Sequence, residues 1–268
     1  MQIKTLAIVG DLHVGSDQGL LPPGFKLDGG QKVGLSDWQK WLWRCWNDYW
    51  HYVDQLAAGG PFAVVVNGDI VDGRHHNTLD LITGNKSWQQ KVCMEVLKPR
   101  LSKASKVWFV RGTPAHTGQQ SEDEELVARD CGGIRCKSTG RHTHQAVYLQ
   151  LGNERIHIAH HIAYSGSHAY KSSPAMRLMA SAFAWAGETG NKPPTIMVRS
   201  HAHDYIEVKR SRCRVVVCPC WQGKTGWAWM KDTISTPTIG GLVICQGELG
   251  VHIREKIYQP KHPIATKL

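Results

Sequence analysis

Apolar runs and helical repeats alternate along the first half of the chain. Short apolar runs bounded by Gly, Pro or Asp are typical of buried strands, and they occur at residues 3–10, 62–67 and 107–111. Apolar residues spaced three and four apart predict helices between them: from Ser36-Asp37 to Gly59, over 87–101, and from Ser121 to Cys131. This β-α-β-α-β-α order predicts parallel pairing of the three strands.

The second half of the chain is dominated by alternating apolar and polar positions. These predict strands near 145–151, 155–160, 195–200, 205–209, 214–218, 241–246 and 250–255, with one helical insertion at about 173–187. Short turns at Gly152-Asn153 and Gly247-Glu248 predict antiparallel hairpins. We expect a single domain over residues 1–258 and an exposed tail over 259–268.

The first predicted helix carries a stripe of aromatic side chains. Its apolar face includes Trp38, Trp41, Trp46 and Tyr49, whereas Trp43 and Trp50 are predicted to lie off that face. Packing against the core is the simpler interpretation of the stripe, and a platform for stacking nucleic-acid bases is the alternative.

The overall charge favours anionic partners. The chain of 268 residues has a formal net charge of +10, which suits nucleic acids, nucleotides or phosphorylated surfaces, although solubility alone is a simpler reason for such a charge. The 8 cysteines are scattered and several lie in apolar runs, which predicts reduced thiols and a cytoplasmic location. We find no signal peptide, and no apolar run approaches the ~20 residues of a membrane span.

Five apolar runs each end in side chains that bind metals or suit a phosphate. The residues that follow these runs are Asp11-Leu12-His13, Gly68-Asp69-Ile70-Val71-Asp72, Gly112-Thr113-Pro114-Ala115-His116, His160-His161 and His201-Ala202-His203. Ends of neighbouring strands can converge on one point, and carboxylates with imidazoles there would hold one or two divalent cations. A lone histidine is most often a structural residue, but five such endings rarely occur together by chance.

These motifs, in this order, resemble those of the calcineurin-like metallophosphoesterase superfamily, over residues 8 to about 204. The resemblance implies an α/β fold, a four-layer α/β/β/α sandwich with two mixed sheets flanked by helices. It also implies that the strands after the last motif, from Val215 onward, form the second sheet. The dinuclear centre that the resemblance implies would use Asp11, His13, Asp69 and His203 for the first metal, and Asp69, His160 and His201 for the second. His160 is preferred to His161, which stays open, and Asp72 would orient a ligand.

One motif departs from the family pattern Gly-Asn-His-Asp/Glu. Gly112 is followed by Thr113 in place of the Asn that binds the second metal through its amide oxygen. Thr113 offers a hydroxyl, which is a weaker ligand. His116 then has two possible roles, as the general acid of the reaction or as a replacement ligand.

The implied chemistry is hydrolysis of a phosphate ester. Two cations clamp the phosphate and lower the pKa of a water, and the metal-bound hydroxide attacks phosphorus. A protonated group, for which His116 is our candidate, assists the leaving group. Mn²⁺ suits the mixture of His and Asp ligands, while Fe, Zn²⁺ and Ni²⁺ remain open.

The substrate is less sharply defined than the chemistry. The loop 14–37 and the segments around Arg74 and after Tyr164 are predicted to surround the metals, so we predict that phosphate is bound by Arg74, His75, Lys171 and Arg177. Trp221, Trp227 and Trp229 could stack a base, although packing is the simpler interpretation. We expect a phosphodiester in a nucleotide or nucleic acid. The alternatives are a phosphomonoesterase or protein phosphatase, and a catalytically degenerate binding protein.

Overall fold

The structure is a computed structural model of the chain, and it describes residues 2–27, 29–75, 79–163, 167–210, 212–232 and 234–260. Most of the predicted tail, as well as His76, Asn77 and Tyr164, therefore lies outside the described residues. Among the helices of these ranges, none is both long and apolar enough to cross a bilayer.

The first sheet is mixed and has six strands in the order β11-β10-β1-β2-β3-β4. Its parallel strands are β1 (Thr5–Val9), β2 (Phe62–Asn67), β3 (Lys106–Val110) and the two-residue β4 (Thr143–His144). The hairpin of β10 (Ile239–Gly247) and β11 (Gly250–Tyr258) joins this sheet through antiparallel pairing of β10 with β1. The prediction that all late strands belong to the second sheet was therefore wrong for β10 and β11. Most of β10 is buried because strands flank it on both sides and α1 contacts it.

The second sheet is also mixed, with five strands in the order β5-β6-β7-β9-β8. Three of them run parallel: β6 (Glu154–Ala159), β7 (Ile196–Arg199) and β9 (Cys213–Val217). Each edge strand joins by an antiparallel hairpin, β5 (Ala146–Leu151) to β6 and β8 (Ile206–Arg210) to β9.

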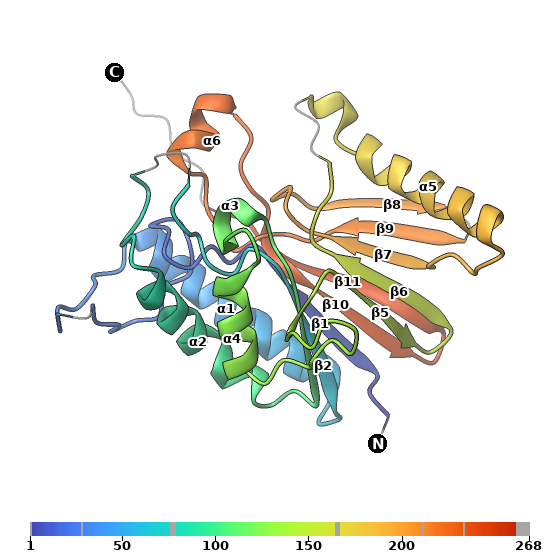
Figure 1. Cartoon of the computed structure of the whole chain (residues 1–268), viewed down its shortest axis with the longest axis horizontal. Coiled ribbons are helices and arrows are strands. Elements are labelled where there is room, and N and C mark those ends of the chain that lie inside the picture. Colours follow the sequence, from blue (N-terminus) through green and yellow to red (C-terminus); the bar gives the residue numbers. More distant parts are fainter. Residues whose placement is uncertain are drawn as a thin grey trace.

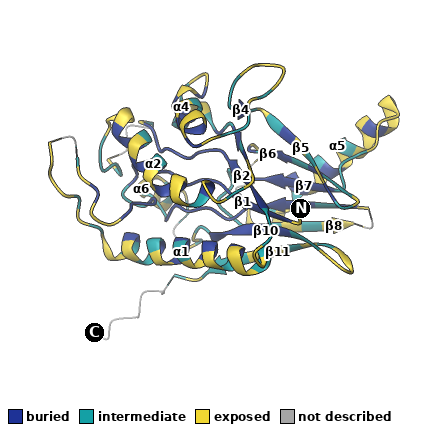
Figure 2. Cartoon of the chain, turned by 90° about the horizontal axis from the view of Figure 1, so that it is seen from below, coloured by how far each residue is buried: buried dark blue, intermediate teal, exposed yellow. Residues whose placement is uncertain are grey.

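Three hydrophobic clusters separate four layers. One lies between the first sheet and α1 (Asp37–Ala57), α2 (Lys86–Leu101) and α4 (Glu122–Asp130). Another fills the space between the two sheets, and a third lies between the second sheet and α5 (Ser173–Thr189). Figure 1 shows α5 on the opposite side of the molecule from α1, α2 and α4, and Figure 2 shows buried central strands, such as β1, β2 and β7, between exposed helix faces. The predicted four-layer α/β/β/α sandwich is confirmed.

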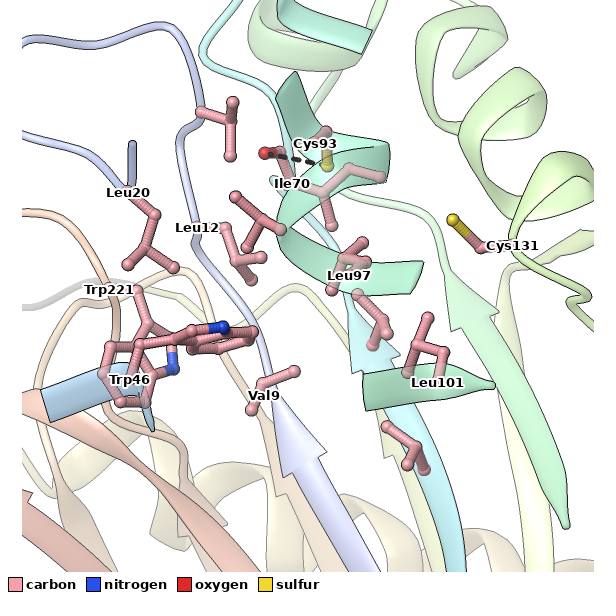
Figure 3. Close-up of a cluster of buried hydrophobic side chains, with 14 of the residues drawn as sticks. Val9, Leu12, Leu20, Trp46, Ile70, Cys93, Leu97, Leu101, Cys131 and Trp221 are labelled. Atoms are coloured by element: carbon pink, nitrogen blue, oxygen red, sulfur yellow. Dashed lines mark hydrogen bonds between the residues drawn. The ribbon is translucent and has the colours of Figure 1, made fainter. Parts of the chain in front are cut away.

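The aromatic stripe of α1 packs into the first of these clusters. Trp46 and Trp50 are both almost fully buried, because they are four residues apart and share one helix face. The prediction that Trp50 lies off this face was wrong. Trp46 also meets Trp221 edge-on, with ring centroids 4.9 Å apart (Figure 3). Trp221 is completely buried and is therefore a core residue.

The structure also contains short elements that the sequence pattern does not predict. They are α3 (Pro114–Thr117), α6 (Gly226–Lys231) and the 3₁₀ turn His168–Tyr170, in addition to β4. Segments of three to six residues are too short to show a periodicity. Of these elements, α3 carries the candidate site residue His116, and α6 follows β9.

Candidate metal centre

Candidate ligands from both sheets meet at the carboxyl ends of the parallel strands. Asp11 follows β1 and Asp69 follows β2, and the Asp11 amide donates to the Gly68 carbonyl at 2.9 Å. From the second sheet, His201 follows β7, and its amide donates to both carboxylate oxygens of Asp11 at 3.0 and 3.2 Å. The Asp11 carboxylate therefore links the ends of the two sheets.

The backbone at this junction has an unusual conformation. Seven described residues other than glycine have a positive φ, and five of them are candidate ligands: Asp11, His13, Asp69, His201 and His203. This left-handed region is costly for side chains with a Cβ, and such residues cluster at functional sites. The tight turns bring side chains that leave their strands in different directions back to a common point.

Two glycines leave room for this convergence. A Cβ on Gly68, where φ is +79°, would lie 2.4 Å from Nδ1 of His160. A Cβ on Gly112 would lie 2.2 Å from Oδ1 of Asp69. Glycine is thus required at both positions for His160 and Asp69 to occupy their places.

The first candidate site consists of Asp11, His13 and His203, whose ligand atoms all lie within 4.8 Å of one another. Nε2 of His203 is 3.5 Å from Oδ1 of Asp11 and 3.1 Å from Nε2 of His13. Nδ1 of His13 lies 2.9 Å from Oδ1 of Asp72. Burial raises the pKa of Asp72, but hydrogen bonds with His13 and His75 outweigh it and hold the pKa well below its usual range. Asp72 is therefore ionised and accepts from Nδ1, which leaves Nε2 of His13 facing the cluster.

The second candidate site contains His160, His161 and His201, again with ligand atoms within 4.8 Å. Nδ1 of His160 bonds to the Asn67 carbonyl at 2.7 Å, and its Nε2 lies 3.0 Å from Oδ2 of Asp69. Burial lowers the pKa of His160, but the negative charges of Asp69 and Asp11 outweigh this effect and raise the pKa to about 10. Likewise, His160 outweighs the effect of burial on Asp69 and holds its pKa well below its usual range. Both His160 and the more exposed His161 remain candidates for the ligand.

Asp69 lies between the two sites. A carboxylate oxygen of Asp69 lies within 4.8 Å of ligand atoms of Asp11 and His160, and likewise of His13 and His116. The Thr113 amide donates to Oδ1 at 2.6 Å, and the Thr113 hydroxyl donates to Oδ2. The predicted ligand Thr113 thus contacts the carboxylate that could bridge two ions.

His116 lies on α3 at the edge of the first site. Its Nδ1 is 2.7 Å from the Asp72 carbonyl, which can only accept, so Nδ1 carries the proton and Nε2 is free of it in the neutral ring. Burial is the main cause that lowers the pKa of His116 to about 4, with His13 as a further cause. The ring is therefore neutral at pH 7 in the metal-free protein.

Two residues at the site were missed by sequence reasoning. Glu124 is buried and accepts from the Gly112 amide at 2.8 Å and from the Ile70 amide at 3.4 Å. Burial and repulsion by Asp69 raise its pKa to about 8. Gln222 donates from Nε2 to Oδ1 of Asp72 at 3.1 Å. The only sequence signal for Glu124 was the acidic run 122–125, which also fits an ordinary helix start.

The four predicted phosphate-binding residues do not all lie at the candidate metal centre. Nε2 of His75 lies 3.4 Å from Oδ2 of Asp72, and the exposed Arg74 precedes it. Nζ of Lys171 bonds to Asp204, next to His203, at 2.7 Å. Arg177 is exposed on α5, and no contact among the described residues brings it to the cluster. Two of the four thus contact residues at the candidate centre: His75 contacts Asp72, and Lys171 contacts Asp204.

Comparisons with known proteins found solved structures that are similar to this chain at low sequence identity. No family model and no curated protein sequence matches the chain. A novel archaeal phosphodiesterase is similar in structure, with 10% identity, 95% of this chain and 99% of that chain covered, and a TM-score of 0.45. Vps29 from Chaetomium thermophilum has 10% identity, 98% and 100% coverage and a TM-score of 0.42. A predicted phosphoesterase from Streptococcus pneumoniae has 11% identity, 96% and 99% coverage and a TM-score of 0.37.

Proposed function

We propose that this protein is a metal-dependent phosphoesterase that hydrolyses phosphodiesters of nucleotides or nucleic acids. One observation carries the proposal. Side chains from the ends of strands in both sheets gather into two adjacent groups that share the region around Asp69. Imidazole nitrogens and carboxylate oxygens are suitable donors for first-row divalent cations, and paired sites of this kind occur in phosphatases and nucleases.

The donors fit two cations. Asp11, His13, Asp69 and His203 would hold the first, and Asp69, His160 and His201 would hold the second. Manganese suits this set, and iron, zinc or nickel would also be accepted. When bound, the ions supply Lewis acidity toward the phosphate and an activated water as the nucleophile.

The residues of the chain have separate tasks in this scheme. Asp72 orients His13 through Nδ1, and Gln222 in turn donates to Asp72. Of the two roles predicted for His116, the ligand role has more support, because the neutral ring presents an unprotonated Nε2 and its one proton is on Nδ1, bonded to the Asp72 carbonyl. Arg74 and His75 lie next to Asp72 and are candidates to contact a phosphate.

A phosphodiester is the favoured substrate because the chain is strongly cationic and exposes Trp227 and Trp229 on α6. A phosphomonoesterase or a protein phosphatase is the rival enzyme. A binding protein with a degenerate centre is the other alternative, since Thr113 stands where the resemblance calls for an Asn.

Parallel assays test the proposal. The Mn²⁺-reconstituted protein is given bis(p-nitrophenyl) phosphate or p-nitrophenyl phosphate, and Asp69→Asn is compared with Asp54→Asn, which changes an exposed residue of α1. We expect faster hydrolysis of the diester, and loss of activity by at least about 100-fold in Asp69→Asn only. Faster hydrolysis of the monoester would favour the rival enzyme. Bound metal with no hydrolysis of either substrate would favour the degenerate binder.

A further inference from the structure

The segment after β9 leaves the candidate metal centre, forms α6 and returns to the centre. At its start, the Trp221 amide donates to the Asp11 carbonyl at 2.9 Å, and Gln222 donates to Asp72. At its end, the Thr238 amide donates to the His203 carbonyl at 2.9 Å. We call residues 222–232 and 234–238 the tryptophan segment. Both of its ends are bonded to candidate ligands or to their partner, so whatever it binds is held beside the centre.

This segment exposes large aromatic and apolar side chains next to lysines. Trp227 is 45% exposed and Trp229 is 49% exposed. Nζ of Lys224 lies 4.0 Å from the centroid of the Trp229 ring, and Nζ of Lys231 lies 5.6 Å from that of Trp227. Each exposed indole therefore has an ammonium group over one face of its ring. Nζ of Lys224 also donates to the Ser235 carbonyl at 2.6 Å, within the same segment.

The position of the segment is held by contacts with other parts of the chain. The Gly226 amide, at the start of α6, donates to Asp80 at 2.7 Å. Asp232, beyond the end of α6, pairs with His168 at 3.2 Å, in the 3₁₀ turn that precedes α5. Figure 1 shows α6 at the same end of the molecule as α3, which carries His116. The exposed tryptophans are thus fixed at one rim of the candidate centre.

We infer that the tryptophan segment binds single-stranded nucleic acid, with bases stacking on Trp227 and Trp229 and phosphates contacting Lys224 and Lys231. Aromatic rings beside cationic groups are the usual means of binding single strands without sequence preference. Double-stranded nucleic acid offers no exposed base faces to such rings. The inference rests on the proposed function, because it takes the metal centre as the place where the bound strand is cut.

An anionic membrane surface is the main alternative to single-stranded nucleic acid as the partner of the tryptophan segment. Trp227, Trp229, Met230 and Ile234 beside lysines could also enter the interface of an anionic membrane. The attachment of the segment to Asp72 and His203 favours a substrate strand, since a membrane anchor needs no bond to the candidate centre. Vesicle binding is therefore an outcome to be tested.

Binding is measured in EDTA, so that hydrolysis does not interfere. Fluorescence anisotropy follows labelled 12-mers of dT and U, an abasic 12-mer and a duplex. We expect Trp227→Ala and Trp229→Ala each to weaken binding of the single strands by about 5-fold, and the double variant by about 25-fold. The abasic strand and the duplex should bind the wild-type protein correspondingly weakly. A difference between the dT and U strands tells whether DNA or RNA is preferred.

Trp185→Ala is the matched control, because Trp185 is 48% exposed but lies on α5. Equal affinity of the tryptophan variants and the wild type overturns the inference, and so does an equal loss in Trp185→Ala or tight binding of the abasic strand. Binding to phosphatidylserine vesicles but not to oligonucleotides also overturns it. The proposed function fails separately, if the wild type with Mn²⁺ binds the strand but cleaves neither it nor bis(p-nitrophenyl) phosphate.

Discussion

Nε2 of His13 and Nε2 of His203 lie 3.1 Å apart, although 190 positions separate the two residues in the chain. Two imidazole nitrogens bound to one zinc at about 2.0–2.1 Å in tetrahedral geometry lie roughly 3.3 Å apart. The observed separation is therefore close to that of two ligands of the same ion. Asp72 holds the His13 ring in the orientation that this requires.

Replacement of His203 is expected to remove one of two metal ions. His203→Ala leaves Asp11 and His13 as an incomplete set, whereas Asp69, His160 and His201 of the other site are unchanged. Mass spectrometry of the metal content after reconstitution with Mn²⁺ should give about two ions per wild-type chain and about one per variant chain. His252→Ala, at an exposed position of β11, is the control and should retain both. Two ions in His203→Ala would contradict the assignment.

Metal binding is expected to release protons. The pKa of His160 is raised to about 10 in the metal-free protein, chiefly by Asp69 and Asp11 against the effect of burial, so its ring is protonated at pH 7.5. A metal needs the unprotonated Nε2 and must displace this proton. The affinity of the second site for a metal ion should therefore rise about tenfold per pH unit between pH 6 and 8, because one proton must leave His160 and the proton concentration falls tenfold per unit.

Calorimetric titration with Mn²⁺ in buffers of different ionisation enthalpy measures this release. We expect at least about one proton per chain at pH 7.5. An affinity that stays constant between pH 6 and 8 would mean that His160 does not become a ligand.

Asp72 is expected to act on the first metal through His13. Asp72→Ala removes the carboxylate oxygen that accepts from Nδ1 of His13 and from Nε2 of Gln222. Loss of such an orienting bond typically costs 10–100-fold in metal affinity, so we expect a decrease of about that size at the first site only. Competition with a chelator measures it, with Asp54→Ala, at an exposed position of α1, as the control. Equal weakening at both sites would point to general disruption of the fold instead.

The candidate ligands could be predicted from sequence because each follows directly after a strand. Runs such as 62–67 are local features, and the order of the motifs identifies the ends that converge. The backbone conformation was not predictable in this way. Histidine is enriched at positive φ, but most histidines have a negative φ, so the residue type of His13 or His203 does not by itself predict this conformation. It is accompanied by bonds to distant segments, such as that of the Thr238 amide to the His203 carbonyl.

Pairing between distant segments limited the rest of the prediction. Whether β10 joins β1 or the second sheet depends on contacts across more than 200 residues, and both sheets offer a buried environment for its apolar residues. Glu124 was missed for a similar reason. The helix around it is recognisable, but only the packing of α4 against the ends of β2 and β3 turns this side chain toward the Ile70 and Gly112 amides.

Glu124 is expected to stabilise the loops that carry Asp69 and Thr113. Glu124→Ala leaves the buried amides of Ile70 and Gly112 without their acceptor, and an unsatisfied buried donor costs about 1–3 kcal/mol. We therefore expect the free energy of unfolding in EDTA to fall by at least about that amount, as measured by urea denaturation. Glu95→Ala, at an exposed position of α2, should have an effect below about 0.5 kcal/mol.

Glu124→Gln tests the protonation of the same group. Burial and Asp69 raise the pKa of Glu124 from 4.5 to about 8, so between these pH values the folded protein binds a proton that the unfolded chain has lost. The wild-type free energy of unfolding therefore contains a contribution that falls as the pH rises from 4.5 to 8. The glutamine cannot titrate, so the difference in stability between wild type and variant should shift in favour of the variant over this range. A pH-independent difference in urea denaturation experiments in EDTA would show that Glu124 is ionised throughout, with its charge held by the two amides.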